Sequence, residues 1–273
     1  MAWLLKVTKI ALGRHGLPAA VFIIGLATSV YAYVDRSKRT QAEQLSQLQD
    51  SAKSYELLLR HRLDLYGSAN HALSAFFSAS RSIQQTEFDD YIRASRVFER
   101  FQGISSFGYL PKVPAADVDR FEAEASRSFP GYRIPQRRAG VNAYFPLLYA
   151  QHSTDPDRAN QLRGVDYSSI PARWAAMQEA DARDAPVATE LHTALRDPRK
   201  RPVILIFSPV RKPFPVAGSP SRQRGSLDGF IFSAVYVDRL FRDFDNGRLA
   251  QNFDLEVFEN TVSRETGVFD SIR

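Results

Sequence analysis

Cysteine is absent from all 273 residues of the sequence. Its absence excludes disulfide bonds, thiolate catalysis and zinc sites built from cysteine. A domain without disulfides can still work outside the cytoplasm if it buries enough apolar surface. The composition is that of a folded protein, because 44% of the residues are hydrophobic, 12% are aromatic and 24% are charged. We therefore expect one or two domains of ordinary size beside any membrane anchor.

Catalytic signatures are also missing from the sequence. No glycine-rich phosphate loop ends in Lys-Ser or Lys-Thr, and no Gly-x-Ser-x-Gly turn occurs. The five histidines have no partner at metal-ligand spacing. The neighbouring acids Asp89 and Asp90 are more typical of a solvated helix face than of a general acid–base pair. The sequence thus predicts no enzyme, no cofactor and no metal site.

A nucleic-acid-binding pattern is lacking as well, although the chain is basic. The formal net charge is +6, from 36 basic and 30 acidic residues. The excess is spread along the chain, and no basic run alternates with aromatic residues. Part of it flanks the longest apolar segment, where attraction to anionic lipid or the topology rule accounts for it. We expect a membrane partner and no nucleic acid.

The one long apolar run spans residues 17–34, eighteen residues without a charge. As a helix it would measure about 27 Å, close to the ~30 Å hydrocarbon core of a bilayer. Basic residues flank it on both sides, so charge does not decide its orientation: Lys6, Lys9, Arg14, Arg36, Lys38 and Arg39. We predict a cytoplasmic segment 1–16, a transmembrane helix 17–34 in the inner membrane, and a periplasmic main domain. The alternatives are a cleaved secretory signal and a buried core helix.

Residues 35–80 form a helix candidate without proline and with Gly67 as its only glycine. Apolar or small residues recur at alternating spacings of three and four, with Arg62 as the one break, at Leu45, Leu48, Ala52, Tyr55, Leu59, Tyr66, Ala69, Leu73 and Phe76. This pattern fits a parallel two-chain stalk that would make the protein a homodimer. It also fits an amphipathic helix lying on its own domain. The two interpretations are compatible, because the far end of a stalk can pack on a globular domain.

The rest of the chain predicts an α+β fold with PAS-like antiparallel sheet architecture after the transmembrane helix and stalk. Strands are expected at 104–113, 143–151, 202–210 and 229–237, with helices at 116–127 and 171–183. The strand at 202–210 is apolar on both faces, and we expect both it and the strand at 229–237 to lie in the core. The sequence stops at Arg273 soon after a strand expected at 253–258 begins a new element, so we expect 238–273 to be a truncated second part.

An ordered set of residues carries a resemblance to a known family. Tyr144-Phe145-Pro146 is followed by Asn160, by Gly164-Val165-Asp166-Tyr167, by Thr189 and by Phe207-Ser208-Pro209-Val210. Over about residues 51–261 the chain resembles a CHASE domain, the extracytoplasmic sensor of plant cytokinin receptors and many bacterial signalling proteins. The resemblance implies a PAS-like ligand-binding part at 81–237 and the start of a membrane-proximal PAS-like part at 238–273. It also implies a second transmembrane helix and an output such as a histidine kinase or diguanylate cyclase, and neither follows in this sequence.

The resemblance also implies a small-molecule pocket. Residues on the expected strands that could line it are Tyr144, Leu147, Tyr149, His152, Thr189, Phe207, Gly229 and Phe232. In the plant receptors an aspartate binds the adenine of cytokinin, and His152 stands at the matching position. Because histidine is not a fixed anionic acceptor, we expect a different ligand, such as an acidic one. For Thr189 a pocket role and a hydroxyl that satisfies the backbone are equally compatible with the sequence.

Two other functions remain open on the sequence alone. A periplasmic scaffold would bind another protein and would have a filled core where a sensor has a cavity. A membrane-bound enzyme would need clustered carboxylates or histidines in that cavity. Sensing of a small molecule is the function that the resemblance favours.

Overall fold

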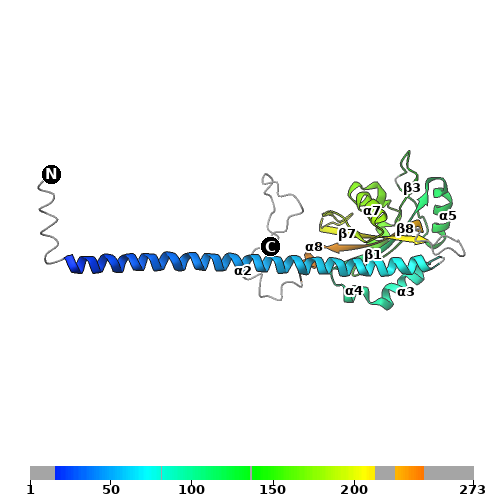
Figure 1. The fold of residues 1–273 in the computed structure, drawn as a ribbon. Helices are drawn as coiled ribbons and strands as arrows, with labels where there is room; N and C mark the ends of the chain where they lie inside the picture. Colours follow the sequence, from blue (N-terminus) through cyan, green and yellow to red (C-terminus); the bar gives the residue numbers. More distant parts are fainter. Residues whose placement is uncertain (1–15, 81, 136, 213–224, 243–273) are drawn as a thin grey trace. The chain divides into compact units, whose positions relative to one another are not determined.

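The computed structural model describes residues 16–80, 82–135, 137–212 and 225–242 (Figure 1). The chain divides into two compact units, Met1–Arg60 and His61–Arg273. The segment expected to be cytoplasmic, but for Gly16, and residues 243–273 of the expected membrane-proximal part lie outside the described residues. Of that part only the beginning is described, as helix α8 (Val237–Arg242).

The first unit consists, in its described part, of the N-terminal portion of helix α2 (Gly16–Ala79). Pro18 fits at the start because the first turn of a helix does not need its backbone N–H. Within the described residues, no helix combines the length and the hydropathy that a membrane crossing requires. The anchor at 17–34 stays a prediction. So does the two-chain stalk, since the side chains of Leu45, Leu48, Ala52 and Tyr55 lie outside those described.

The second unit is built on an antiparallel sheet, as predicted. The strand order is β4-β1-β8-β7-β5, and β6 also pairs with β7. The strands are β1 (Ile104–Pro111), β4 (Tyr149–His152), β5 (Val187–Ala188), β6 (His192–Thr193), β7 (Pro202–Lys212) and β8 (Ser226–Tyr236). β7 and β8 pair as a long antiparallel hairpin in the middle of the sheet, and they correspond to the two runs that were predicted to be core strands. The α+β class with an antiparallel sheet is therefore confirmed.

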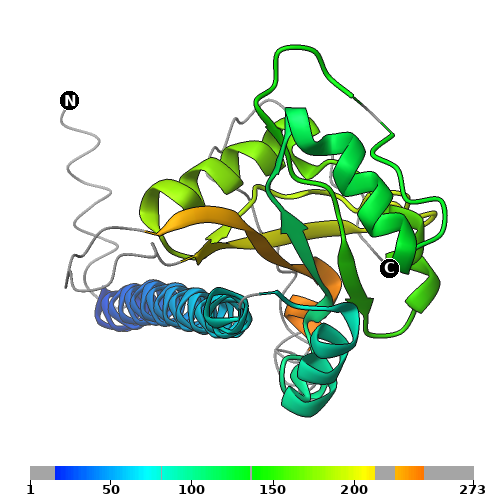
Figure 2. The same ribbon diagram turned by 90° about the vertical axis from the view of Figure 1, so that its right-hand side faces the viewer.

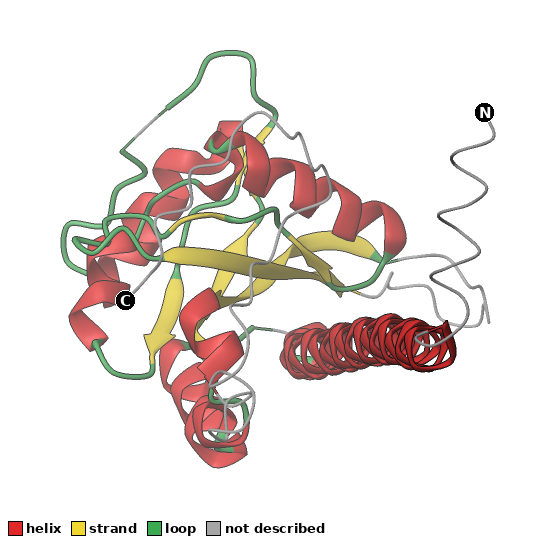
Figure 3. Ribbon diagram, turned by 90° about the vertical axis from the view of Figure 1, so that its left-hand side faces the viewer, coloured by secondary structure: helices red, strands yellow, loops and turns green. Residues whose placement is uncertain are grey.

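Helices cover both faces of this sheet (Figures 2 and 3). One face carries the end of α2, and the other carries α7 (Pro171–Arg183), which packs on β7. The remaining helices are α3 (Gln85–Ser95), α4 (Val97–Arg100), α5 (Val118–Ser128) and α6 (Pro156–Leu162), with short 3₁₀ turns at η1 (Ala115–Asp117) and η2 (Tyr167–Ser169). The core on the α7 side is rich in aromatic and aliphatic residues from β7 and β8.

The part of α2 within the second unit packs on its own domain. Tyr66, Leu73 and Phe77 are buried. Asn70 Nδ2 donates a hydrogen bond to the Ile206 carbonyl oxygen at 2.6 Å, and the Ser74 hydroxyl donates to that of Pro209. The prediction that the far end of the helix packs on the domain is confirmed for these residues.

The break in the heptad pattern also has an explanation within the chain. The Arg62 guanidinium is partly buried and donates a hydrogen bond to the Leu240 carbonyl oxygen of α8 at 3.0 Å. Arg62 thus joins α2 to the last described helix and is not a charge exposed in a seam.

The strand expected over residues 143–151 is two strands. β3 (Ala143–Tyr144) pairs with β2 (Val113–Pro114) in a separate small sheet, whereas β4 pairs with β1. Pro146 interrupts the run because it has no N–H to donate to a ladder. The intervening backbone turns instead to the loop before η2: Leu147 donates to the Val165 carbonyl at 3.0 Å.

Candidate ligand-binding site

A cavity of about 40 Å³ lies between the sheet and helices α6 and α7. Its walls are mainly apolar and include Leu147, Leu162, Val203, Leu205, Phe232 and Ala234. Its polar lining residues are Ser106, His152, Arg158, Tyr167, Arg173 and Tyr236. No aspartate or glutamate is among the lining residues. The polar side of the cavity is therefore basic.

The structure brings three of the eight predicted residues to this cavity, Leu147, His152 and Phe232. Tyr144 belongs to the core around the small sheet, and its hydroxyl donates to the Arg138 carbonyl oxygen at 2.9 Å. The Tyr149 hydroxyl donates to the Ile83 carbonyl oxygen at 3.0 Å. The prediction assumed that Tyr144 and Tyr149 alternate along one strand. The break at Pro146 places them in two different sheets instead.

The other three predicted residues have structural surroundings. The Thr189 hydroxyl accepts a hydrogen bond from the Leu205 N–H at 3.0 Å, so it satisfies the backbone of β7. Phe207 is fully buried in the core that packs under α7. At Gly229 an added Cβ would lie 2.3 Å from the Leu110 carbonyl oxygen. The space that glycine leaves there is filled by the backbone of β1.

Arg173 is the least compensated charge in the cavity wall. Its side chain belongs to α7 and is 3% exposed, and its Nε and Nη1 atoms have no hydrogen-bond partner among the described residues. Its guanidinium carbon lies 4.5 Å from the centre of the Tyr167 ring. Burial lowers the pKa of Arg173, but a guanidinium stays charged in proteins. Burial also raises the pKa of Tyr167, so that phenol stays neutral and provides no counter-charge.

The second arginine of the wall, Arg158, already has partners. Its Nη1 lies 3.5 Å from Asp197 Oδ1, and its Nη2 donates to the Leu195 carbonyl oxygen at 3.2 Å. The other carboxylate oxygen of Asp197 accepts from Arg201 Nε at 2.8 Å. Burial alone would raise the pKa of Asp197, but the hydrogen bond from Arg201 and the nearby charges hold it below its usual value. Asp197 is thus an anion shared by two arginines.

His152 contributes a hydrogen-bond donor to the cavity. Its Nδ1 accepts from the backbone N–H groups of Thr154 at 3.2 Å and Asp155 at 3.0 Å. A neutral ring that accepts at Nδ1 carries its proton on Nε2. That Nε2 is buried without a partner among the described residues. Burial, followed by the charge of Arg158, lowers the pKa of His152 to about 4.

The low pKa of His152 predicts an acid sensitivity. The folded state resists protonation of the ring, so its contribution to stability is complete above about pH 6.5 and is lost as the pH falls towards 4. We expect the free energy of unfolding to fall by about 1–2 kcal/mol, because the ring is only half-buried and solvent screens part of its charge. The charges that face the ring are Arg158, Asp155, Arg239 and Arg201.

The matched variant for this prediction is His152→Asn, because the asparagine oxygen can take the place of Nδ1 and does not titrate. Urea unfolding of both proteins from pH 7 to pH 4 provides the comparison. The wild-type protein should lose stability relative to the variant as the pH falls, and parallel curves would contradict the prediction.

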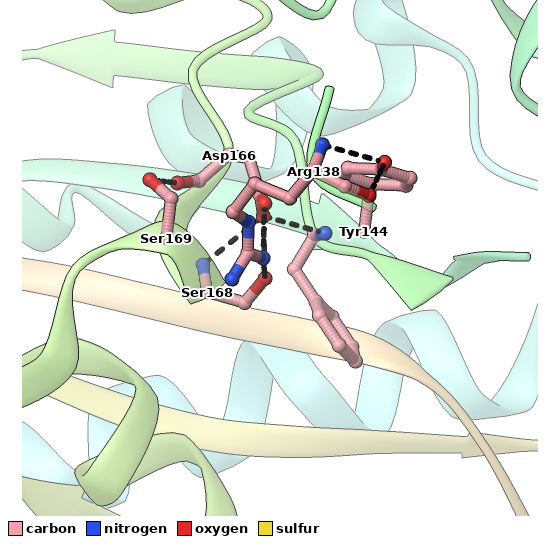
Figure 4. Close-up of polar contacts among 6 residues, drawn as sticks. Arg138, Tyr144, Asp166, Ser168 and Ser169 are labelled. Carbon is pink, nitrogen blue, oxygen red and sulfur yellow. Dashed lines mark hydrogen bonds and ion pairs between the residues drawn. The ribbon is translucent and has the colours of Figure 1, made fainter. Parts of the chain in front are cut away.

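A polar cluster fixes the wall that carries Tyr167 (Figure 4). Asp166 Oδ1 accepts from the Phe145 N–H at 3.0 Å, the Ser168 N–H at 3.1 Å and the Ser168 hydroxyl at 2.7 Å. Its Oδ2 accepts from Arg138 Nη2 at 2.7 Å. Asp166 is therefore fully engaged in holding η2 and cannot neutralise Arg173. The aspartate of the Gly-Val-Asp-Tyr motif therefore has a structural role, because it holds η2 against the segment around Phe145.

Sequence reasoning did not select Arg158, Tyr167, Arg173 or Tyr236 as site residues. One signal was available for Arg173, which lies three, four and seven positions before the buried residues Ala176, Met177 and Ala180. This spacing places an arginine on the buried face of a helix. An arginine on such a face needs a partner, and the sequence around it supplies none.

One comparison with known proteins identifies the kind of domain. The family model of the CHASE domain matches residues 81–269, more than half of the chain. No curated protein matches the chain significantly. Among the described residues, no group of histidine and acidic side chains could hold a metal ion.

Two solved structures are similar at low identity. One is the ligand-binding domain of the Pseudomonas aeruginosa PAO1 amino acid chemoreceptor PctC in complex with GABA (14% identity, TM-score 0.36, 70% of this chain and 59% of that chain). The other is a methyl-accepting chemotaxis protein X (13% identity, TM-score 0.40, 72% of this chain and 63% of that chain). The chain spans about three fifths of the length of each.

Proposed function

This chain belongs to the CHASE domain family of extracytoplasmic sensors, and we propose that it binds a small molecule in the cavity beside Arg173 and His152. The proposal includes a membrane anchor at residues 17–34, a dimeric stalk from residue 35, and a PAS-like ligand-binding part at 81–237. Binding is transmitted to an output domain through the stalk. The domain senses and does not catalyse.

The observation that carries this proposal is the cavity with buried donors in its wall. A buried donor without a partner costs about 1–3 kcal/mol, and a charged one costs more. Arg173 holds two such nitrogens within a largely apolar enclosure. A scaffold domain would gain stability by filling this space with an apolar side chain. A buried arginine beside this cavity therefore favours a site for a ligand.

The sheet provides a route from the cavity to α2. Val203 and Leu205 of β7 line the cavity. The same strand accepts the buried hydrogen bonds of Asn70 and Ser74 through the carbonyls of Ile206 and Pro209. A ligand that shifts β7 therefore acts on α2 through fixed contacts. If the ligand binds more tightly to one of two arrangements of α2, the difference in binding free energy should be about 1–3 kcal/mol.

A thermal-shift screen of the purified full chain tests the proposal. At a hundred times its dissociation constant a ligand should stabilise the protein by about 2.7 kcal/mol, which raises the melting temperature by a few degrees. The Ala234→Leu variant, which fills the cavity, should lose this shift while keeping its circular dichroism spectrum.

A matched control for this variant is Ala188→Leu, at an exposed position of the same sheet that does not line the cavity. It should keep the shift. A shift that survives in Ala234→Leu would place the ligand elsewhere, and a broad panel without any stabilising compound would favour the scaffold function.

A further inference from the structure

The chemistry of the cavity wall identifies the class of ligand, provided that the proposed sensing function is correct. We propose that the ligand is a short monocarboxylate, held by the guanidinium of Arg173 and the Nε2–H of His152. The apolar remainder of the ligand packs against Leu147 and Phe232.

The unpartnered polar atoms of the site are all hydrogen-bond donors. They are Nε and Nη1 of Arg173 and Nε2 of His152, whose tautomer follows from the two backbone N–H groups at its Nδ1. A ligand that satisfies them must present acceptors. Both Nε–H and Nη1–H belong to a charged guanidinium, and a hydrogen bond from a charged donor to a carboxylate oxygen is about twice as strong as one between neutral groups.

The charge of the site calls for an anion. Asp197 is shared by Arg158 and Arg201, and the carboxylate of Asp166 is held by Arg138. Among the described residues, no aspartate or glutamate forms an ion pair with Arg173, which is 3% exposed. One negative charge on the ligand would therefore compensate Arg173, for which the described part of the chain provides no carboxylate.

The composition of the wall excludes amino acids as good ligands. An ammonium group beside the carboxylate would need an acceptor or an anion, and no acidic side chain lines the cavity. Arg158 lines the same wall and would repel a second cation. Acetate should therefore bind better than glycine, and propionate better than alanine.

The size of the cavity limits the length of the ligand. Its volume is about 40 Å³, and one water-sized group needs roughly 10–15 Å³ on the same measure. About three such groups fit, which corresponds to a carboxylate with a short aliphatic chain. Affinity should pass through a maximum near acetate or propionate and fall for longer chains.

Isothermal titration calorimetry of the purified full chain with matched ligands tests this inference. The series comprises formate, acetate, propionate, butyrate and hexanoate. Propionamide is the neutral counterpart, alanine adds an ammonium group, and inorganic phosphate is a different anion. We expect propionate or acetate to bind at least a hundredfold more tightly than propionamide, alanine or phosphate.

Variants on one helix separate the role of Arg173 from a general effect on α7. Arg173→Gln should weaken the binding of the preferred carboxylate at least a hundredfold, and Arg173→Lys should weaken it about tenfold because it keeps the charge but not the planar set of donors. Arg183→Gln, which removes an exposed charge from the same helix, should leave affinity unchanged. If Arg173→Gln fails to fold, the lysine variant and the comparison of propionate with propionamide still test whether Arg173 binds a carboxylate.

Equal binding of propionate and propionamide, preferential binding of phosphate, or no binding by any carboxylate would overturn this inference. None of these results would overturn the sensing function. A compound of another class whose thermal shift disappears in Ala234→Leu would still support it. If no carboxylate binds and no compound gives a thermal shift that disappears in Ala234→Leu, the cavity is not a ligand site.

Discussion

Replacement of Asp166 by alanine should lower the free energy of unfolding by about 2–5 kcal/mol, because each buried donor that loses its acceptor costs about 1–3 kcal/mol. The side chain of Asp166 is completely buried where it meets Arg138. Its loss leaves the N–H groups of Phe145 and Ser168 without their acceptor. Because these groups hold η2 and the turn at Pro146, the wall of the cavity should loosen as well. Urea denaturation followed by circular dichroism measures the effect.

The isosteric variant Asp166→Asn provides the control. Its amide oxygen can still accept from Phe145 and Ser168, whereas the charge facing Arg138 is lost. We expect it to cost about half as much as the alanine variant. A loss below about 1 kcal/mol for Asp166→Ala would show that the cluster in Figure 4 does not hold the fold together.

Gly164→Ala should be comparably destabilising, by about 3–5 kcal/mol, for a different reason. Gly164 has φ +81°, and an added Cβ would lie 1.9 Å from the Arg133 carbonyl oxygen. The left-handed conformation alone costs an alanine about 1–2 kcal/mol. The clash with the backbone adds the rest, because no side chain can move aside to relieve it. Thermal and urea unfolding give the free energy.

Gly140→Ala separates the two contributions. Gly140 has φ +76°, but nothing lies within 4 Å of its added Cβ. This variant should show only the conformational cost of about 1–2 kcal/mol. Equal losses for the two variants would mean that the close approach of Gly164 to Arg133 does not constrain the fold.

The sequence was most informative where local pattern and tertiary environment agree. The runs at 202–210 and 229–237 were predicted to be core strands, and they form the central hairpin β7–β8, buried on both sides. The motifs that resembled a CHASE domain are confirmed by the family match over residues 81–269. Within this framework Gly164 and Asp166 belong to the resemblance for structural reasons.

The candidate site was predicted less well because it depends on contacts distant in sequence. Tyr144 and Tyr149 were expected to alternate along one strand, but Pro146 and the hydrogen bonds to the loop before η2 divide that strand between two sheets. At Gly229 the sequence could indicate free space but not that β1 fills it. Pattern alone could not reveal that Asp197 neutralises Arg158 and leaves Arg173 without an anion.

The most direct test of the central claim, that the cavity beside Arg173 is a ligand site, is a nitrogen-15 NMR spectrum of the arginine Nε–H groups during addition of the preferred ligand. The resonance of Arg173, identified by its absence in Arg173→Lys, should shift in proportion to occupancy. The exposed arginine at 183 should not respond. Binding that leaves the Arg173 resonance in place would contradict the account and place the ligand outside this cavity.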